Sequence, residues 1–343
     1  MIETEYMNTL TLKPEETIKK NISFTSADFS DKNAFHIAYG IDRNFLLGCG
    51  VSIASVLITN PNRNFHFHVF IDEINDMETD KFSQLAESYN VCIDIHIVDC
   101  KKLKELPTTK NWSVAMYFRF VIGDYFFGKQ DKILYLDADV ICNGDLSELI
   151  TLNLNGKVSA VVKERDEHWW SLRAESLECP ELEKGYFNSG VLLLNVNEWA
   201  QFSVSTKALE MLSNHAITKK LSYMDQDILN LILFNNVKFV DRIYNTQFSI
   251  NYELKNNCIN PITESTVFIH YVGPTKPWHE WANYKSTTPF LEAKKLSPWN
   301  NNSLLKPTNS NYARYCAKHK FKQHKPFSAL LTYAYYFYLK VVR

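Results

Sequence analysis

The chain alternates short apolar stretches, rich in β-branched and aromatic residues, with longer stretches in which apolar positions repeat at helical spacing. The longer stretches predict helices near 44–59, 79–89, 112–127, 197–214 and 224–234. The short ones predict strands at 34–40, 65–71, 91–98, 132–137, 158–162, 190–195, 237–240 and 266–271. Strands that alternate with helices predict an α/β fold around a mostly parallel, doubly wound sheet.

The two ends of the chain depart from this pattern. Residues 1–33 have no sustained periodicity, and we expect them to form an irregular leader before a main domain at 34–295. We expect a C-terminal helical, basic and aromatic extension at 296–343. Its last part, 326–343, is nearly apolar for about four turns, so it is either an anchor on a membrane surface or a helix packed on the body.

A further apolar run, 45–58, is too short to span a bilayer and predicts a buried helix.

Charge is unevenly distributed along the chain, although the formal net charge is only −1. Residues 293–343 carry ten Lys or Arg and no Asp or Glu, so the first 292 residues have a net charge of −11. A basic, aromatic tail on an acidic body favours an anionic membrane surface as a partner. Cations interleaved with aromatic residues can also bind nucleic acid, but a lipid surface accounts for them more simply, and we expect no nucleic-acid partner.

The cysteines and the N-terminus both favour a reducing compartment. Seven cysteines are scattered without any Cys-x-x-Cys pair, which argues against a disulfide framework and against a cysteine zinc site. The first residues, "MIETEYMNTLTLKPEE", lack the apolar core of a secretory signal. We therefore expect a cytoplasmic protein.

Two carboxylates follow the predicted strand 132–137 in "ILYLDADVICNGDL". Asp137 and Asp139 are two residues apart, so in extended chain both side chains point the same way and can bind one Mg²⁺ or Mn²⁺ ion. The alternative is that they only cap the turn after the strand. Ligands of doubly wound sheets bind beyond the carboxyl ends of the strands, where these residues are expected.

A second motif, "FIHYVGPTKPWHEW", begins at the end of the last predicted strand. His270 can add an imidazole to the two carboxylates, which favours Mn²⁺ without excluding Mg²⁺. Lys276 can neutralise phosphate oxygens, and Gly273 lets the backbone approach them closely.

Five motifs in order resemble glycosyltransferase family 8: "AYGIDRNF" (38–45), "LYLDADV" (134–140), "YFNSGVLLLN" (186–195), "YMDQDILN" (223–230) and "HYVGPTKPW" (270–278). Within that family the chain most resembles bacterial lipopolysaccharide core hexosyltransferases, over about 34–295, and its basic, aromatic C-terminus is typical of the same branch. The resemblance implies a GT-A type nucleotide-sugar fold, a UDP-hexose donor and Mg²⁺ or Mn²⁺ on Asp137, Asp139 and His270. It also implies retaining transfer of glucose or galactose to the outer core of lipopolysaccharide, at the cytoplasmic face of the inner membrane.

The resemblance also assigns roles to individual residues. Asp225 and Gln226 match the positions nearest the anomeric carbon, and Asn188 completes the catalytic set. The residues implied in donor binding are Ala38, Gly40, Ile41, Asp42, Arg43, Asn44, Arg119, Asp137, Ala138, Asp139, Asn188, Ser189, Gly273 and Lys276. A carboxylate after the strand 158–162 helps bind the sugar in some relatives; Lys163, Glu164, Arg165 and Asp166 compete for that place here, and we favour Asp166.

Several of these residues have structural alternatives. Asp42 can be the N-cap of a helix, and Arg119 can belong to an internal ion pair. Asp227 can lie in the first turn of a helix, where negative charge is favourable.

The mechanism follows from charge. A metal ion, Lys276 and Arg119 would stabilise the leaving UDP. Retention favours a front-face reaction, with a double displacement on Asp225 as the alternative.

Two other classes of protein fit the sequence less well. One is a phosphotransferase of the haloacid dehalogenase type, which the Asp-x-Asp pattern also fits, and the other is a non-catalytic sugar-binding protein docked on a membrane.

Overall fold

The computed structural model describes residues 13–108 and 113–342. Residues 1–12 of the predicted leader, Trp112 of a predicted helix and the terminal Arg343 lie outside the described residues. The chain forms two compact units from interleaved segments. One contains the residues up to Asn44 with Arg63–Asp137 and Ser147–Arg242, and the other contains Phe45–Asn62, Ala138–Leu146 and the residues from Ile243 onward. The predicted domain boundary at residue 295 stays a prediction.

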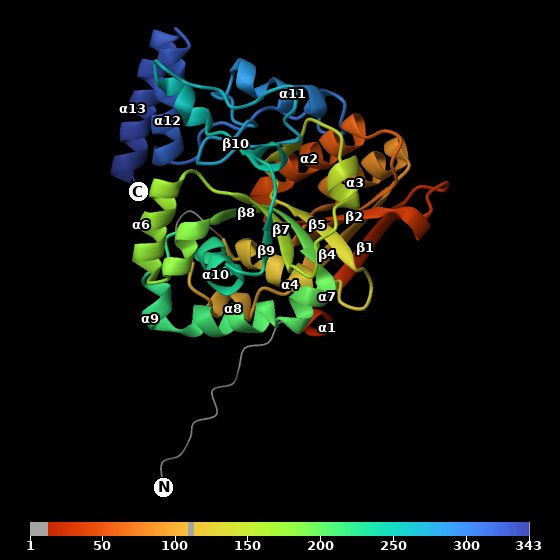
Figure 1. Ribbon diagram of the computed structural model, residues 1–343. Helices are drawn as coiled ribbons and strands as arrows, with labels where there is room; N and C mark the ends of the chain where they lie inside the picture. Colours follow the sequence, from red (N-terminus) through yellow and green to blue (C-terminus); the bar gives the residue numbers. More distant parts are fainter. Residues whose placement is uncertain (1–12, 109–112, 343) are drawn as a thin grey trace. The chain divides into compact units, whose positions relative to one another are not determined.

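The first unit is built on an eight-stranded sheet with the order β1-β4-β3-β2-β5-β8-β7-β9 (Figure 1). Strands β4, β3, β2 and β5 run parallel, β8 is antiparallel to both of its neighbours, β9 is parallel to β7, and β1 is antiparallel to β4. The strands are β1 (Ile18–Thr25), β2 (Phe35–Ile41), β3 (Phe65–Ile71), β4 (Cys92–Val98), β5 (Lys132–Leu136), β7 (Ser159–Lys163), β8 (Phe187–Asn195) and β9 (Val237–Phe239). The predicted α/β class with a mostly parallel sheet is therefore confirmed.

Apart from α1, which precedes β1, the helices of the first unit follow its strands along the chain. They are α1 (Pro14–Thr17), α3 (Asp76–Tyr89), α4 (Phe118–Tyr125), α5 (Ser147–Thr151), α6 (Glu167–Leu177), α7 (Val196–Gln201), α8 (Val204–Ser213), α9 (His215–Thr218) and α10 (Met224–Leu233). Strand β5 is buried from Ile133 to Leu136, and every residue of β8 from Phe187 to Leu194 is buried. Such continuous apolar strands are typical of a sheet covered on both faces.

Three predictions about local structure differ from the observed elements. The predicted leader contains a regular strand, β1, which pairs with β4. The sequence did not predict it because most of its side chains, such as Lys20, are exposed. The predicted helix at 112–127 is a 3₁₀ turn (Val114–Tyr117) followed by α4. The predicted helix at 197–214 is broken between α7 and α8, where Ser203 has a φ of 53° in the left-handed region that helices exclude.

The second unit contains a three-stranded sheet in the order β10 (Thr246–Gln247), β11 (Phe268–His270) and β6 (Val140–Cys142). Its helices are α2 (Leu46–Thr59), α11 (Thr288–Lys295), α12 (Ser310–Lys322) and α13 (Pro326–Val342). Helix α2 is buried from Leu46 to Leu57, as its composition predicted. Its glycines are required by packing, since a Cβ at Gly48 or Gly50 would overlap the rings of Trp278 and Trp299.

The C-terminal helices α12 and α13 pack against each other within the second unit (Figure 1). Helix α12 is held firmly, because His319 is fully buried and its Nε2 lies 2.9 Å from Asn251 Oδ1. Helix α13 buries Ala329, Thr332 and Leu339. Its other side exposes large apolar side chains: Phe327, Leu330, Leu331, Tyr335, Phe337, Tyr338, Val341 and Val342. Among the described residues, no helix has the length and apolar character needed to cross a bilayer.

Candidate active site

Asp137 directly follows β5 in the first unit, at the carboxyl end of a parallel strand as predicted. Its backbone N–H donates to the carbonyl oxygen of Gly190 at 2.8 Å, which fixes the residue to β8. Its Oδ1 accepts a hydrogen bond from Tyr135 Oη at 2.8 Å and lies 3.1 Å from Arg119 Nη2. The carboxylate is therefore oriented before any ligand arrives.

Arg119 of α4 pairs with two carboxylates inside the first unit. Its Nε lies 2.8 Å from Asp225 Oδ2, its Nη2 contacts Asp137, and its Nη1 donates to the carbonyl oxygen of Ser189 at 2.7 Å. Burial raises the pKa of Asp225 to about 6, although the charge of Arg119 acts in the opposite direction. These contacts match the structural alternative for Arg119, and a contact with a donor diphosphate stays a prediction.

The structure brings together three residues that the resemblance placed around the donor hexose. Asn188 Nδ2 lies 3.2 Å from Gln226 Oε1, and the backbone N–H of Ser189 donates to the same oxygen at 3.0 Å. All three side chains are buried, on β8 and the first turn of α10. Their amide and hydroxyl groups are therefore held in one orientation by the sheet.

Glu164, rather than Asp166, lies beside this amide cluster. Asn188 Nδ2 donates to Glu164 Oε2 at 2.8 Å, and Glu164 is buried. Asp166 is instead the N-cap of α6, where its Oδ1 accepts from the backbone N–H of Trp169 at 3.0 Å. The preference for Asp166 is thus not supported by its position. One signal pointed to Glu164: it directly follows a strand end.

Asp227 is fully buried and has a structural role. Both of its oxygens lie 2.8 Å from Arg173 Nη2, and Tyr186 Oη donates to Oδ1 at 2.6 Å. Its Oδ2 also accepts the backbone N–H groups of Ser222 and Tyr223, the two residues before α10. Asp227 therefore fixes the turn that leads into Asp225 and Gln226, as its non-catalytic alternative suggested.

The end of β2 carries the residues that the resemblance assigned to the nucleotide. Asp42 Oδ1 accepts the backbone N–H of Asn44 at 2.8 Å, and its Oδ2 accepts from Ser113 Oγ at 2.7 Å. Asp42 thus caps the 3₁₀ turn Arg43–Phe45, the local alternative, while Arg43 and Asn44 are exposed. A Cβ at Gly40 would lie 2.9 Å from Phe118 Cβ, so glycine is required there by packing. Donor contacts of Ala38, Ile41 and the residues around them stay predictions.

A compact charged cluster lies in the second unit. His270, at the end of β11, places its Nε2 3.2 Å from Asp139 Oδ1, while Lys276 Nζ contacts Asp139 Oδ2 and donates to the carbonyl oxygen of Tyr271 at 2.9 Å. Burial opposes the ionisation of Asp139, but the charges of Lys276 and His270 outweigh it and hold the pKa of the carboxyl below its usual range. Gly273, between His270 and Lys276, has a φ of 88°, a conformation that favours glycine.

This cluster has the chemistry of a divalent metal site. His270 Nδ1 lies 3.0 Å from Asn245 Oδ1, so the amide oxygen holds the hydrogen on Nδ1 and leaves Nε2 as the nitrogen that faces Asp139. A ligating histidine commonly has such an outer partner. Asp137, the other expected ligand, precedes Asp139 by two residues along the chain. The residues fit Mg²⁺ or Mn²⁺, which prefer carboxylate oxygens and accept one imidazole.

The comparison with solved structures identifies the fold. A central, mostly parallel sheet whose strand ends carry acidic and amide side chains is that of a GT-A type glycosyltransferase. A galactosyltransferase, LgtC, crystallised with donor and acceptor sugar analogs, has this fold, with a TM-score of 0.64 at 23% identity over 77% of this chain and 96% of LgtC.

The sequence comparisons identify the family. The sequence model of glycosyl transferase family 8 matches residues 36–282, and that of the family's C-terminal region matches residues 284–340. The chain belongs to glycosyltransferase family 8, and it is an enzyme of that class. It is 48% identical to the lipopolysaccharide 1,3-galactosyltransferase of Salmonella typhimurium, over 96% of this chain and 98% of that protein. It is 46% identical to the lipopolysaccharide glucosyltransferase WaaO of Escherichia coli, over 99% of this chain and 97% of WaaO.

Proposed function

We propose that this glycosyltransferase moves glucose or galactose from a UDP-sugar to the outer core of lipopolysaccharide, with retention of the anomeric configuration. The observation that carries the proposal is similarity along nearly the whole chain to two enzymes named for transferring these sugars to lipopolysaccharide. The charged cluster around Asp139 supports a catalytic protein over a sugar-binding scaffold, because a buried carboxylate held ionised beside a lysine suits phosphate chemistry.

In this proposal Asp137, Asp139 and His270 hold one Mg²⁺ or Mn²⁺ ion. When bound, the ion supplies positive charge to the diphosphate oxygens of the leaving UDP. Lys276, fixed by Asp139 and by the carbonyl oxygen of Tyr271, places a second positive charge for the same oxygens. Departure of UDP then needs no protonating acid.

Asn188, Ser189 and Gln226 orient the donor hexose. Asp225 is 6% exposed and paired with Arg119, so it is poorly placed to act as a nucleophile. This pairing supports a front-face reaction, in which the leaving phosphate takes the proton of the acceptor hydroxyl. Mass-spectrometric detection of a hexose attached to Asp225 would instead establish a double displacement.

The direct test measures UDP release from UDP-glucose and from UDP-galactose, with truncated lipopolysaccharide core as the acceptor and with Mg²⁺ or Mn²⁺ added. We expect acceptor-dependent turnover of one donor in preference to the other, and an α-linked product. Turnover of neither donor under any of these conditions would overturn the proposed substrate pair.

Glu164→Gln is expected to lower kcat/KM for the donor about 10- to 100-fold, because a hydrogen bond to a charged group contributes about 1.5–3 kcal/mol. Glu164 positions Asn188, so the effect should appear mainly in the KM for the UDP-sugar. The matched control is Asp166→Asn, which keeps a side chain that can cap α6 and is expected to cost under about 1 kcal/mol of stability while leaving kcat/KM near wild type. The reverse pattern, with the larger loss in Asp166→Asn, would contradict this assignment.

We further propose that the enzyme works in the cytoplasm, docked on the inner membrane through α13. Exposed apolar side chains of this helix, such as Phe327 at 84% and Leu331 at 74%, are flanked by the basic residues of a tail without acids. Apolar insertion combined with attraction to anionic lipid gives reversible binding at a membrane surface.

Replacing Phe327 and Leu331 together by serine is expected to weaken binding to vesicles that contain anionic lipid by at least about tenfold, because each apolar side chain contributes about 1.5–3 kcal/mol when buried. Hydrolysis of the UDP-sugar should be unchanged. Point substitutions are preferable to truncation after Asn311, since α12 packs firmly in the second unit. The control replaces Ile259 and Leu296, which are also exposed, by serine. Equal vesicle binding by both double variants would contradict docking through α13.

A further inference from the structure

The first unit has an unusual polar surface inside its sheet. Side chains two residues apart along a strand share a face, and one face of β2, β3 and β4 carries four histidines and an aspartate where a covered parallel sheet normally carries apolar residues. We call this set the histidine face: His36, His66, His68, Asp94 and His96. His36, His68 and His96 are at most 4% exposed. None of these residues belongs to the candidate active site.

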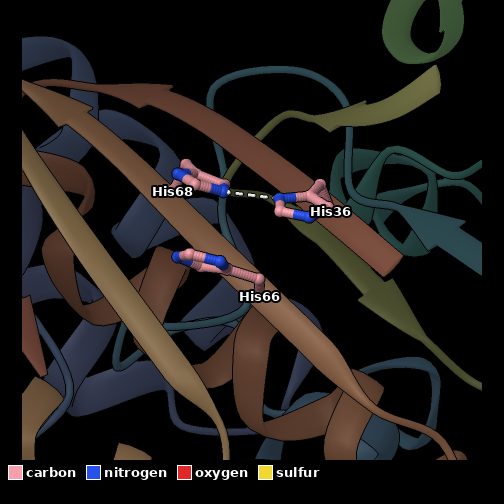
Figure 2. Close-up of side chains that lie close together, drawn as sticks. All are labelled: His36, His66 and His68. Atoms are coloured by element: carbon pink, nitrogen blue, oxygen red, sulfur yellow. Dashed lines mark hydrogen bonds between the residues drawn. The ribbon is translucent and has the colours of Figure 1, made fainter. Parts of the chain in front are cut away.

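The rings of the histidine face lie at ligand spacing. One ring nitrogen from each of His36, His66 and His68 falls within a group whose members are no more than 4.8 Å apart (Figure 2). His36 Nδ1 and His68 Nε2 are 3.0 Å apart. Two nitrogens bound tetrahedrally to one Zn²⁺ ion at about 2.0–2.1 Å would be about 3.3 Å apart, which is close to the distance between these two nitrogens.

Neighbouring polar side chains already orient these rings through hydrogen bonds. His66 Nε2 lies 2.9 Å from Asp94 Oδ2, and His68 Nδ1 lies 3.2 Å from His96 Nε2. His96 Nδ1 in turn donates to Asn21 Oδ1 of β1 at 2.7 Å. Metal-ligating histidines commonly donate their second N–H group to such a partner, which fixes the tautomer and the ring orientation.

The charges around the histidine face and its access to solvent also suit a cation. Asp31, which is exposed, places its Oδ1 2.8 Å from His66 Nδ1, so the face has an opening to solvent on that side. Burial lowers the pKa of His36 to about 4, which leaves its ring in the neutral form that binds metals. Burial opposes protonation of His66, but its hydrogen bonds to Asp94 and Asp31 act in the opposite direction and the pKa of the ring is raised to about 10, so the ring carries a positive charge between these carboxylates when no ion is bound.

We propose that the histidine face is a second metal site, which binds an imidazole-preferring divalent ion of the Zn²⁺ class through His36, His66 and His68. On binding, the N–H bond at the ligating nitrogen of His66 breaks, its proton passes to solvent, and the ion replaces that charge between Asp31 and Asp94. Since the three ligands lie on β2 and β3, the ion would tie these strands together. Its three imidazole ligands distinguish this site from the proposed metal site at Asp137, Asp139 and His270, where carboxylate oxygens suit harder ions.

The test is a calorimetric Zn²⁺ titration of the full chain after chelator treatment and dialysis. The background chain carries Asp139→Asn, which disables the proposed metal site of the active site. We expect one Zn²⁺ per chain, an affinity at least about 100-fold weaker in His66→Gln, and one about 10- to 100-fold weaker in Asp94→Asn. The matched control, His215→Gln, changes an exposed histidine outside the histidine face and should bind as the background does. Far-UV circular dichroism checks that each variant is folded.

A spectroscopic measurement keeps the proposal testable if His66→Gln does not fold. Zinc-edge X-ray absorption of the loaded Asp139→Asn protein should give three imidazole nitrogens in the first coordination shell. An ion bound mainly by oxygen, the same Zn²⁺ affinity in His66→Gln as in the background, or no Zn²⁺ binding below about 100 µM would each overturn the proposal.

Discussion

Asp139→Asn is expected to reduce hexose transfer at least about 1,000-fold, equivalent to about 4 kcal/mol of transition-state stabilisation. The amide keeps the size of the side chain but removes the negative charge that a divalent ion and Lys276 both require. The loss should appear in UDP release as well as in transfer, because both need the leaving diphosphate to be stabilised. Calorimetry should also show weaker binding of UDP in the presence of Mn²⁺.

The control for this variant is Asp145→Asn, which removes a carboxylate from an exposed position on the same segment of the second unit. Its turnover should stay within about twofold of wild type, since surface substitutions away from a site have small effects. Wild-type turnover in Asp139→Asn, or an equal loss in both variants, would show that Asp139 does not hold a catalytic ion.

Arg119→Met is expected to lower the free energy of unfolding by about 3–5 kcal/mol, because it leaves the buried carboxylate of Asp225 and the partly buried carboxylate of Asp137 without their cation. Urea unfolding of the full chain measures the change. The surface variant Arg43→Met is the control: Arg43 pairs with Glu73 at 3.0 Å, but both side chains are more than 60% exposed, so the expected cost is under about 1 kcal/mol.

The double variant Arg119→Met with Asp225→Asn separates charge from packing. If the cost of Arg119→Met comes from an unpaired buried carboxylate, removing the charge of Asp225 should recover part of the lost stability. A cost in Arg119→Met no larger than in Arg43→Met would contradict the assignment of a buried ion-pair network.

The parts of the site that sequence could predict are those that depend on a strand and its end. The apolar run before Asp137 ends where β5 ends, and the strand before His270 ends at that residue, so the positions of both expected ligands at strand ends followed from local pattern alone. Partners across the fold were not accessible in this way. The pairing of Arg119 with Asp225, and the choice of Glu164 over Asp166 beside Asn188, depend on how α4, α6 and α10 pack.

The histidine face also depends on contacts between strands that local sequence pattern does not predict. The stretch "FHFHVFI" predicts a strand, and its period of two places His66 and His68 on one face. That His36 and His96 join them depends on the register of β2 and β4 against β3, which the sequence does not specify. The strand β1 was missed for a related reason: an edge strand whose residues are all exposed or only half-buried resembles irregular chain.

The interleaving of the two units has a consequence for synthesis on the ribosome. When residue 242 has emerged, every strand of the eight-stranded sheet is available, but β6 lacks β11, the neighbour that it pairs with. Helix α2, which is buried almost throughout, must then wait for Trp278 and Trp299, which are made more than 200 residues after it. The nascent chain therefore carries an apolar helix that is only partly covered through most of its translation, so we expect its need for chaperones to last until the last third of the chain has emerged.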